Sequence, residues 1–220
     1  MVRINDLIRI IVPSRGRPEN AHRLLKRIQE TSTDGLYLTF AVDSDDPTIS
    51  DYPSAYTVEV SGGSMVQALN EIAVRNEKYS GYVAFLGDDT LPHAGWHEKV
   101  TAALTSQDNS IVYGNDLIHG QNLPTSVFMD YNIVRTLGYM APPNQKQLFV
   151  DNYWKALGEA LGTLQYVPEA IIEHLHPIAG KAPSDPSYDR AYSNDRWRED
   201  EEAFLDHMAD QFPKDVDKLR

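Results

Sequence analysis

The chain has 220 residues and a formal net charge of −12, from 20 basic and 32 acidic side chains, and it contains no cysteine. The acidic balance argues against sequence-specific or wholesale nucleic-acid binding, because such binding needs a basic face that neutralises phosphates. The absence of cysteine excludes disulfides, thiolate metal ligands and a cysteine nucleophile, and it fits a cytoplasmic protein. No apolar run has the length of a membrane span, and the first residues lack the pattern of a signal peptide, so we expect no membrane attachment.

The charge is distributed unevenly along the chain. Residues 1–30 are rich in arginine and lysine, whereas the segment that follows Asp195 is rich in aspartate and glutamate. A locally basic segment on an acidic protein suits a small anionic ligand better than a charged polymer.

Short apolar runs alternate with amphipathic segments through the first half of the chain. The runs predict strands at Leu7–Val12, Leu36–Val42, Tyr56–Val60, Tyr82–Leu86 and Ser110–Tyr113. The amphipathic segments predict helices at Glu19–Thr31, Met65–Lys78 and Pro92–Thr105. This alternation is typical of an α/β fold with a mostly parallel central sheet flanked by helices.

Three polar loops follow predicted strands, at Pro13–Pro18, Asp43–Pro47 and Gly87–Thr90. Ligands of such sheets bind outside the carboxyl ends of the strands, so we expect the three loops to converge on one crevice. The adjacent Asp88 and Asp89 repel each other and call for a neighbouring cation, for which a divalent metal that holds a phosphate is the usual answer. The alternative is a strand-exit turn, which Gly-Asp-Asp also suits.

The loop after the first strand carries Arg15 and Arg17, which can reach a phosphate or a base beside a helix start. A solvated basic turn is the alternative. The loop lacks both GxxxxGK[ST] and GxGxxG, which argues against a phosphate-gripping loop and a nicotinamide cofactor. Asp43, after the second strand, can accept hydrogen bonds from a ribose hydroxyl or a base, whereas Asp46 precedes Pro47 and is better explained by turn chemistry.

The second half of the chain is less regular, and no boundary divides the chain into two independent cores. Its patterns predict a strand at Val127–Val134, a helix at Asp151–Leu161, short strands at Gln165–Val167 and Ala170–Leu175, loop or arm from Gly180 to Asp195, and a helix at Glu199–Gln211.

Two late histidines and one aspartate complete the candidate residues. His174 and His176 project from the same side of a strand, and two imidazoles at this spacing suit a metal ion. Asp151 lies between an apolar run and a helix, where it is either a general base or a helix N-cap.

Several of these segments, in this order, resemble the GT-A fold glycosyltransferases of the family-2 type. The segments are Ile10–Pro18, Asp43, Ser64–Ala73, Tyr82–Asp89, Phe149–Trp154 and His174 or His176. The resemblance implies donor binding by Pro13, Ser14, Arg15, Arg17, Asp43, Asn70, Gly87 and Asp88. It also implies metal binding by Asp89 with His174 or His176, and a catalytic base at Asp151 of an inverting transfer.

The implied fold is one GT-A-like, Rossmann-like domain over residues 1–180, with a nucleotide-binding half at 1–115, an acceptor half at 116–180, and a C-terminal arm at 181–220. The implied activity is transfer of a sugar from a nucleotide-diphosphate sugar, with UDP-sugars favoured, to a hydroxyl acceptor. Mn²⁺ or Mg²⁺ would be the cofactor. The acceptor would be a soluble protein, small molecule or modified base, a homodimer is possible, and the setting would be the cytoplasm of a bacterium or of a phage's host.

One residue departs from the family pattern, because position 87 is glycine and the signature is Asp-Asp rather than Asp-x-Asp. Two other readings stay open. A nucleotidyltransferase of related fold needs a more glycine-rich loop after the first strand than this chain has. A nucleotide- or carbohydrate-binding module without catalysis needs only the pocket.

Overall fold

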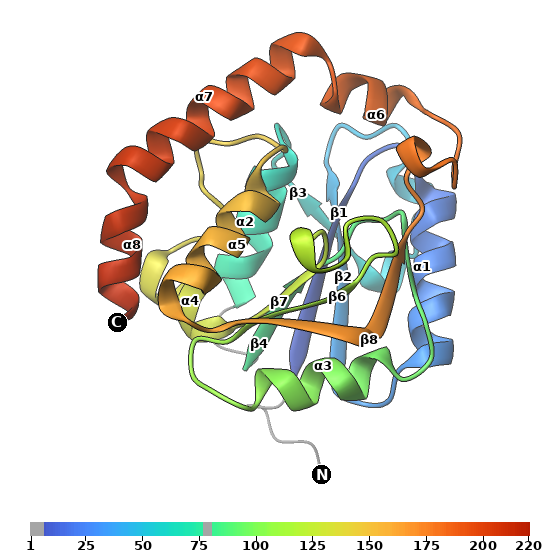
Figure 1. Cartoon of the computed structure of the whole chain (residues 1–220). Coiled ribbons are helices and arrows are strands. Elements are labelled where there is room, and N and C mark those ends of the chain that lie inside the picture. Colours follow the sequence, from blue (N-terminus) through green and yellow to red (C-terminus); the bar gives the residue numbers. More distant parts are fainter. Residues whose placement is uncertain (1–6, 77–80) are drawn as a thin grey trace.

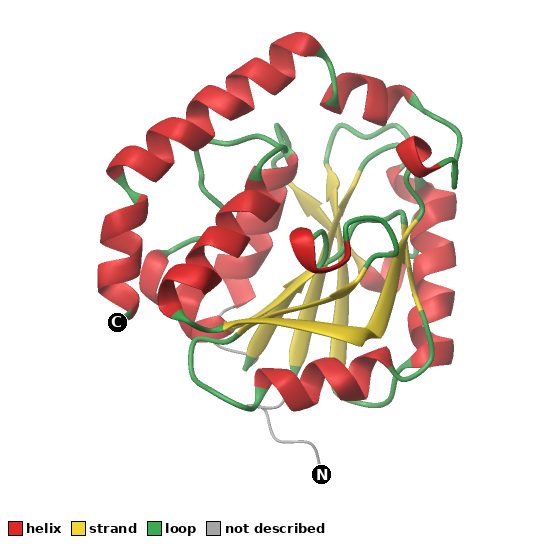
Figure 2. Ribbon diagram, viewed as in Figure 1, coloured by secondary structure: helices red, strands yellow, loops and turns green. Residues whose placement is uncertain are grey.

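A curved, eight-stranded sheet forms the centre of the molecule in the computed structural model, which describes residues 7–76 and 81–220 (Figures 1 and 2). The strands follow the order β3-β2-β1-β4-β7-β6-β8-β5 across the sheet. Their bounds are β1 Ile8–Ser14, β2 Leu36–Asp43, β3 Thr57–Val60, β4 Tyr82–Phe85, β5 Thr90–Pro92, β6 Ile111–Asn115, β7 Val127–Asp130 and β8 Leu164–His174. The expected α/β fold with a mostly parallel sheet is confirmed.

The first four strands of this order form a parallel block. β1 pairs in parallel with β2 and with β4, and β2 pairs in parallel with β3. The carboxyl ends of these strands therefore meet at one edge, which brings the three polar loops that follow β1, β2 and β4 together.

The other half of the sheet contains antiparallel pairs. β7 runs antiparallel to both β4 and β6, and β8 runs parallel to β6. β5 then pairs antiparallel with the end of β8, so that Thr90 lies opposite His174. This last pairing joins segments that are far apart in the sequence.

Helices cover both faces of the sheet. Their bounds are α1 Pro18–Thr31, α2 Met65–Asn76, α3 Trp96–Leu104, α4 Tyr131–Leu137, α5 Val150–Leu161, α6 Pro186–Ala191, α7 Asn194–Asp210 and α8 Phe212–Leu219. Single 3₁₀ turns lie at Ile49–Asp51, Ser54–Tyr56, Gly120–Asn122 and Pro177–Ala179. Among the described residues, no helix is both long enough and apolar enough to cross a bilayer.

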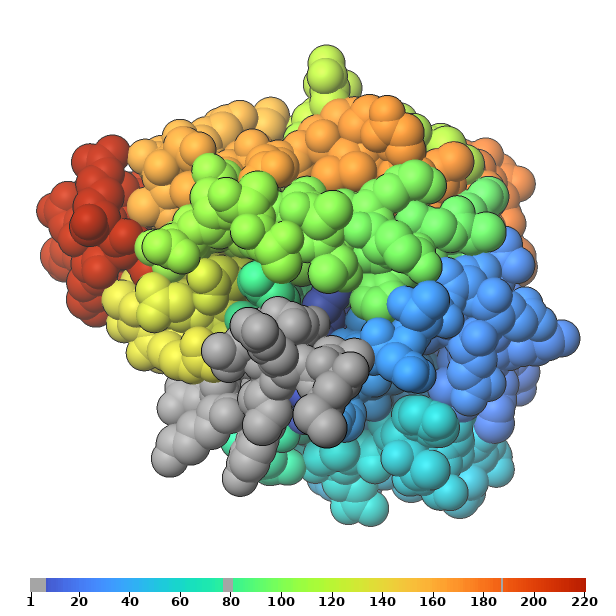
Figure 3. Space-filling view, turned by 90° about the horizontal axis from the view of Figure 1, so that it is seen from below, coloured from blue at the N-terminus to red at the C-terminus, as the bar shows by residue number. Residues whose placement is uncertain are grey.

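Each face of the sheet has its own hydrophobic cluster. One cluster packs α1 and α3 against alternate strand residues such as Ile10 and Phe40, and the other packs α2, α4, α5 and α8 against residues such as Ile11 and Val83. Strands that are buried on both faces read as continuous apolar runs, which is why their positions were predictable. Seen from below, α3 (green) lies beside β8 (orange), with α1 (blue) and α8 (red) at opposite sides (Figure 3).

Several element predictions were wrong in their details. The strand expected at Val127–Val134 ends at Asp130, because the Asp130 side chain accepts a hydrogen bond from the Asn132 N–H and thereby caps α4. The helix expected from Pro92 begins only at Trp96, because Thr90–Pro92 forms β5.

The C-terminal half also differs from the prediction. The two short strands expected between Gln165 and Leu175 are the single strand β8, and the expected loop between Gly180 and Asp195 contains α6. α7 begins earlier than expected, at Asn194, with Ser193 as its N-cap, and α8 was not predicted. Lys78, at the end of the second predicted helix, lies outside the described residues.

The C-terminal helices are part of the core. Val216 and Leu219 of α8 belong to the same hydrophobic cluster as α2 and α5. Asp215, which is fully buried, accepts hydrogen bonds from Tyr153 of α5 and Gln211 and lies 3.2 Å from Nε2 of His207. The arc that α6, α7 and α8 make around the molecule in Figure 1 is therefore anchored at its end.

Candidate active site

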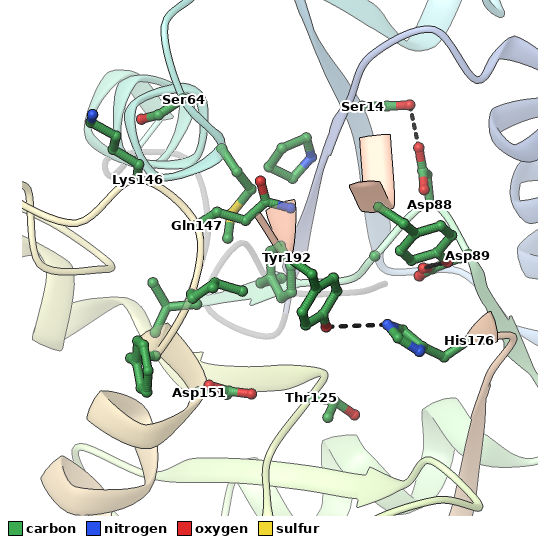
Figure 4. Close-up of a pocket in the computed structure, with 18 of the residues that line it drawn as sticks. Ser14, Ser64, Asp88, Asp89, Thr125, Lys146, Gln147, Asp151, His176 and Tyr192 are labelled. Carbon is green, nitrogen blue, oxygen red and sulfur yellow. Dashed lines mark hydrogen bonds between the residues drawn. The ribbon is translucent and has the colours of Figure 1, made fainter. Parts of the chain in front are cut away.

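A cavity of about 610 Å³ lies at the carboxyl edge of the parallel strands. Its walls come from the three polar loops, from the loop before α5 and the first turn of α5, from the loop between β6 and β7, from the end of β8, and from the arm that carries α6 and the start of α7. Figure 4 shows part of this lining. Among the residues predicted from sequence, those in the cavity wall are Pro13, Ser14, Arg15, Arg17, Asp43, Gly87, Asp88, Asp89, Asp151, His174 and His176.

Asp88 joins the first and third of the polar loops. Its Oδ2 accepts a hydrogen bond of 2.6 Å from the Ser14 hydroxyl, and its Oδ1 accepts one of 3.1 Å from Nη1 of Arg17. The Asp88 side chain is buried, and burial together with the neighbouring charge of Asp89 raises its pKa. The expected convergence of these loops is therefore confirmed by direct contacts.

Asp89 meets a histidine from the other end of the chain. Oδ2 of Asp89 lies 3.3 Å from Nε2 of His174. The pairing of β5 with β8 causes this meeting, because the Leu175 N–H donates to the Asp89 carbonyl at 2.8 Å and fixes the register. Burial alone would raise the pKa of Asp89, but the hydrogen bond and charge of His174 outweigh burial and lower it.

The two late histidines have different surroundings. Nδ1 of His176 accepts a hydrogen bond from the Ile178 N–H at 3.1 Å, so Nε2 carries the proton that bonds the Tyr192 hydroxyl at 3.1 Å. Both nitrogens of His176 are thus in use. His174 instead has a buried Nδ1 that has no hydrogen-bond partner among the described residues.

The side chains of Asp89 and His174 are placed as two neighbouring ligands of a divalent ion would be. Two ligands at right angles around an octahedral ion, each about 2.1 Å from it, lie roughly 3 Å apart. The observed 3.3 Å is near this separation. The carboxylate oxygen suits Mn²⁺ or Mg²⁺, and of these two ions the imidazole nitrogen favours Mn²⁺. Within residues 7–76 and 81–220, no three Asp, Glu, His or Cys side chains converge on one point, so other ligands would have to come from a substrate and from water.

Gly87 has a steric reason to be glycine. A Cβ built at this position would lie 2.5 Å from Oδ1 of Asp89, which is closer than real contacts allow. A side chain at position 87 would therefore displace the Asp89 carboxylate, and the Asp-Asp form of the signature is consistent with the local packing.

Arg15 and Asp43 face each other in the part of the cavity wall formed by the loops after β1 and β2. Nη1 of Arg15 donates to Asp43 at 2.8 Å and to Asp45 at 2.5 Å. Asp46 is used for turn chemistry, as predicted, because its carboxylate accepts the N–H groups of Thr48 and Gly16.

Asn70 is the one predicted donor-binding residue that the structure does not bring to the cavity. Its amide donates to the Ala141 carbonyl at 2.8 Å and accepts the N–H groups of Met140 and Ala141. Asn70 thereby links α2 to the loop before α5.

Asp151 lies in the second position of α5, and its side chain faces the cavity. The residue before the helix is Phe149, in a left-handed conformation, so Asp151 is not the N-cap. Burial raises the pKa of Asp151. A carboxylate with a raised pKa is a stronger base, so the geometry leaves the general-base role open.

Residues that the sequence reasoning missed close the cavity. From the arm, Asp185 accepts two hydrogen bonds from Arg17, at 2.8 and 2.7 Å, and the Tyr188 hydroxyl donates to Oδ2 of Asp89. The Arg17 guanidinium also lies 4.3 Å from the centre of the Tyr188 ring. No local sequence signal points to these contacts, which depend on the path of the arm.

The loop between β6 and β7 supplies a second missed group, formed by Asp116, His119 and Thr125. His119 Nδ1 lies 2.8 Å from Oδ2 of Asp116, and both His119 and Thr125 line the cavity. The sequence does contain a signal for this group. Asp116 follows an apolar strand, as Asp43 and Asp88 do, and a carboxylate in that position is expected at the edge of the sheet where ligands bind.

Helix α7 supports the wall formed by the loop before α5. The buried carboxylate of Asp200 accepts the N–H groups of Lys146, Gln147 and Leu148 at 2.7, 3.0 and 2.9 Å. Phe149 packs edge-on against Trp197 of α7, with ring centres 5.1 Å apart. The acidic C-terminal segment thus helps to shape the cavity.

Comparison with known proteins relates the fold to a set of solved structures. No protein-family model matches the sequence, and no curated protein matches it significantly. The structure of residues 1–349 of TarS from S. aureus, in complex with UDP, superposes with a TM-score of 0.62 and 9% identity. The superposed region covers 76% of this chain, and this chain spans 59% of the TarS chain.

Two further structures extend the similarity. Glucosyl-3-phosphoglycerate synthase from Mycobacterium tuberculosis, in complex with Mg²⁺ and UDP, superposes with a TM-score of 0.63 and 13% identity. The superposed region covers 91% of this chain and 78% of the synthase chain. A mannosyltransferase from Pyrobaculum calidifontis, in complex with GDP-Man and Mn²⁺, has a TM-score of 0.51 and 14% identity, with coverage of 96% and 72%. At these identities the likeness shows the fold alone, and the fold is GT-A.

Proposed function

We propose that the protein transfers a sugar from a nucleotide-diphosphate sugar to a hydroxyl group of a soluble acceptor. The observation that carries the proposal is the meeting of Asp89 with His174, 3.3 Å apart, beside the Asp88–Arg17 pair in one cavity. Carboxylates, an imidazole and a guanidinium at the carboxyl ends of parallel strands suit a diphosphate and its metal ion.

The donor would lie along the loops that follow β1, β2 and β4. Asp43 would bond the base or the ribose, and Arg15, which now bonds Asp43, lies beside that position. Arg17 would bind the diphosphate after exchanging its bonds to Asp185 for bonds to phosphate oxygens. The similar structures with UDP or GDP-Man support this placement, and UDP is the nucleotide we favour.

A Mn²⁺ or Mg²⁺ ion held by Asp89 and His174 would, when bound, neutralise the negative charge on the departing diphosphate. His174 suits this role better than His176, because both nitrogens of His176 are already in hydrogen bonds.

Asp151 would take the proton of the acceptor. As the acceptor oxygen forms its bond to the anomeric carbon, its O–H bond breaks and the proton moves to the Asp151 carboxylate. The bond from the anomeric carbon to the diphosphate breaks at the same time, and its electron pair leaves with the nucleoside diphosphate. Attack from the face opposite the leaving group would make the transfer inverting.

A panel of nucleotide-sugars tests the proposal. The purified protein is incubated with UDP-, GDP- and ADP-sugars, with Mn²⁺, with Mg²⁺ or with a chelator, and release of nucleoside diphosphate is measured. We expect release from at least one donor, which the chelator abolishes. The melting temperature of the protein is measured with each donor and metal as well. If no donor raises the melting temperature under any metal condition, the proposal is contradicted. Release of pyrophosphate from a nucleoside triphosphate would favour a nucleotidyltransferase instead.

A further inference from the structure

Asp116 has all of its hydrogen-bonding capacity directed at one loop. Its side chain is 3% exposed, and Oδ1 accepts the N–H groups of Ile118, His119 and Gly120 at 3.0, 2.7 and 3.0 Å. Oδ2 accepts the Thr125 hydroxyl at 3.1 Å and contacts Nδ1 of His119 at 2.8 Å. Five contacts on a single buried carboxylate hold the loop between β6 and β7 in one conformation.

These contacts also determine which nitrogen of His119 carries the proton. Three backbone N–H groups and the Thr125 hydroxyl donate to the two oxygens of Asp116, an arrangement that suits a carboxylate acting as acceptor only. An ionised carboxylate only accepts hydrogen bonds, and Nδ1 of His119 must therefore donate. In the neutral imidazole, Nε2 then presents a lone pair and can only accept.

The lone pair of Nε2 is available to a ligand. The His119 side chain is 40% exposed and forms part of the cavity wall, and its Nε2 has no hydrogen-bond partner among the described residues. Asp151 lines the same cavity as His119. Figure 4 shows Thr125, which bonds the same Asp116 carboxylate, on the side of the cavity where Asp151 lies.

A turn-stabilising role for Asp116 explains only part of this arrangement. The three backbone N–H contacts would form with almost any residue at position 119. The contact between Asp116 and the His119 ring is not needed for the turn. This contact fixes both the orientation and the tautomer of an imidazole that faces the cavity.

We propose that the Asp116–His119 pair binds the acceptor, with Nε2 of His119 accepting a hydrogen bond from a hydroxyl that neighbours the reacting hydroxyl at Asp151. Two groups that only accept hydrogen bonds, in the wall of one cavity, suit a ligand that carries two O–H donors. The acceptor is therefore a polyhydroxylated molecule, a sugar or other polyol, rather than a simple alcohol or a phenol. This inference rests on the proposed glycosyl transfer.

Two small alcohols with the same three-carbon chain test the inference. Glycerol has neighbouring hydroxyls and 1-propanol does not, and each is added to the protein with the donor and metal found in the panel. Diphosphate release above the rate in water is measured for wild type, His119→Asn and His119→Gln. Asparagine can still donate to Asp116 as Nδ1 does, whereas glutamine can place an amide oxygen near the position of Nε2.

We expect glycerol to stimulate wild type more than 1-propanol does. His119→Asn should lower the ratio of glycerol to 1-propanol stimulation about fivefold, the worth of one hydrogen bond, and His119→Gln should recover part of it. His22→Asn, which removes a histidine of α1 outside the cavity, is the matched control and should keep the wild-type ratio. An unchanged ratio in His119→Asn, or no advantage of glycerol in a wild type that releases diphosphate, would overturn the inference.

The tautomer gives an independent readout. Long-range ¹H–¹⁵N correlation spectra of wild type should show His119 protonated at Nδ1, and the signal of Nε2 should shift when glycerol is added with donor and metal. A proton on Nε2 would overturn the inference even if turnover follows the expected pattern. Absence of both nucleotide binding and diphosphate release in wild type would instead refute the proposed function, and the inference with it.

Discussion

The Tyr188 hydroxyl donates a hydrogen bond to Oδ2 of Asp89, the same oxygen that lies 3.3 Å from Nε2 of His174. In the same segment, Asp185 holds the Arg17 guanidinium through two hydrogen bonds. The arm thus occupies the two groups that a metal ion and a diphosphate would contact. Donor binding would have to displace both contacts, and this requirement leads to the first prediction.

Replacing Tyr188 by phenylalanine should strengthen metal-dependent nucleotide binding. Phenylalanine keeps a ring beside Arg17 but removes the hydroxyl that competes for Asp89. A hydrogen bond to a charged group contributes about 1.5 kcal/mol or more, so the dissociation constant for UDP with Mn²⁺ should fall about tenfold. Isothermal titration calorimetry measures this constant.

The matched control for this variant is Tyr192→Phe, which removes a hydroxyl that bonds His176 and not Asp89. Its affinity should stay close to that of wild type. Weaker binding by Tyr188→Phe would show that the hydroxyl assists the donor site rather than competing with it.

Asp151→Asn should abolish transfer and preserve nucleotide affinity. The amide keeps the size of the side chain but cannot take a proton, and loss of a general base typically costs 10²- to 10⁴-fold in rate. Turnover is measured by diphosphate release in the presence of glycerol, and affinity by calorimetry with UDP. Turnover within about threefold of wild type would exclude Asp151 as the base.

Asp46 should stabilise the protein in a pH-dependent way. Burial would raise its pKa, but the N–H groups of Thr48 and Gly16 outweigh burial and lower it below the ordinary value. Because the folded-state pKa is the lower one, the stabilisation is present above about pH 4 and is lost as the pH falls below that value. The difference in stability between wild type and Asp46→Asn should therefore be largest at neutral pH and shrink in acid.

Thermal denaturation at pH 7, 5 and 3.5 measures this difference. Asp34→Asn, at an exposed position before β2, is the control and should match wild type at each pH. A difference that grows as the pH falls would contradict the assignment of Asp46.

Asp200→Asn should destabilise the wall of the cavity. The substitution replaces one of two accepting oxygens by an amide that faces the N–H groups of Gln147 and Leu148. Buried donors that lose their acceptor cost about 2 kcal/mol, which urea denaturation can resolve. Asp206→Asn, on an exposed position of the same helix, should have little effect, and equal stability of the two variants would contradict the role of Asp200.

The parallel half of the fold was predictable because its strands are buried on both faces and read as short apolar runs. β5 was missed because it has three residues and its register depends on β8, a strand about 80 residues away in sequence. The run through Ile133 and Val134 is apolar enough to predict a strand, but the Asp130 side chain caps the chain into α4.

The residues of the candidate site likewise fall into those that the sequence could place and those that it could not. Carboxylates that directly follow predicted strands, such as Asp43 and Asp88, could be placed at the common edge by topology alone. Asp116 directly follows the apolar strand β6 and could be placed at the same edge by the same topology. The contacts of Asp185 and Tyr188 could not be predicted, because they depend on how the arm folds back over residues that are 99 or more positions away.

The most direct measurement is the affinity of wild type and Asp89→Asn for UDP, by calorimetry, with Mn²⁺ and with a chelator. Asp89→Asn keeps the shape of the side chain but removes the charge beside His174. We expect Mn²⁺ to tighten UDP binding by wild type at least about tenfold, and to have no such effect on the variant. Equal enhancement by Mn²⁺ in both proteins would contradict a metal site at Asp89 and His174.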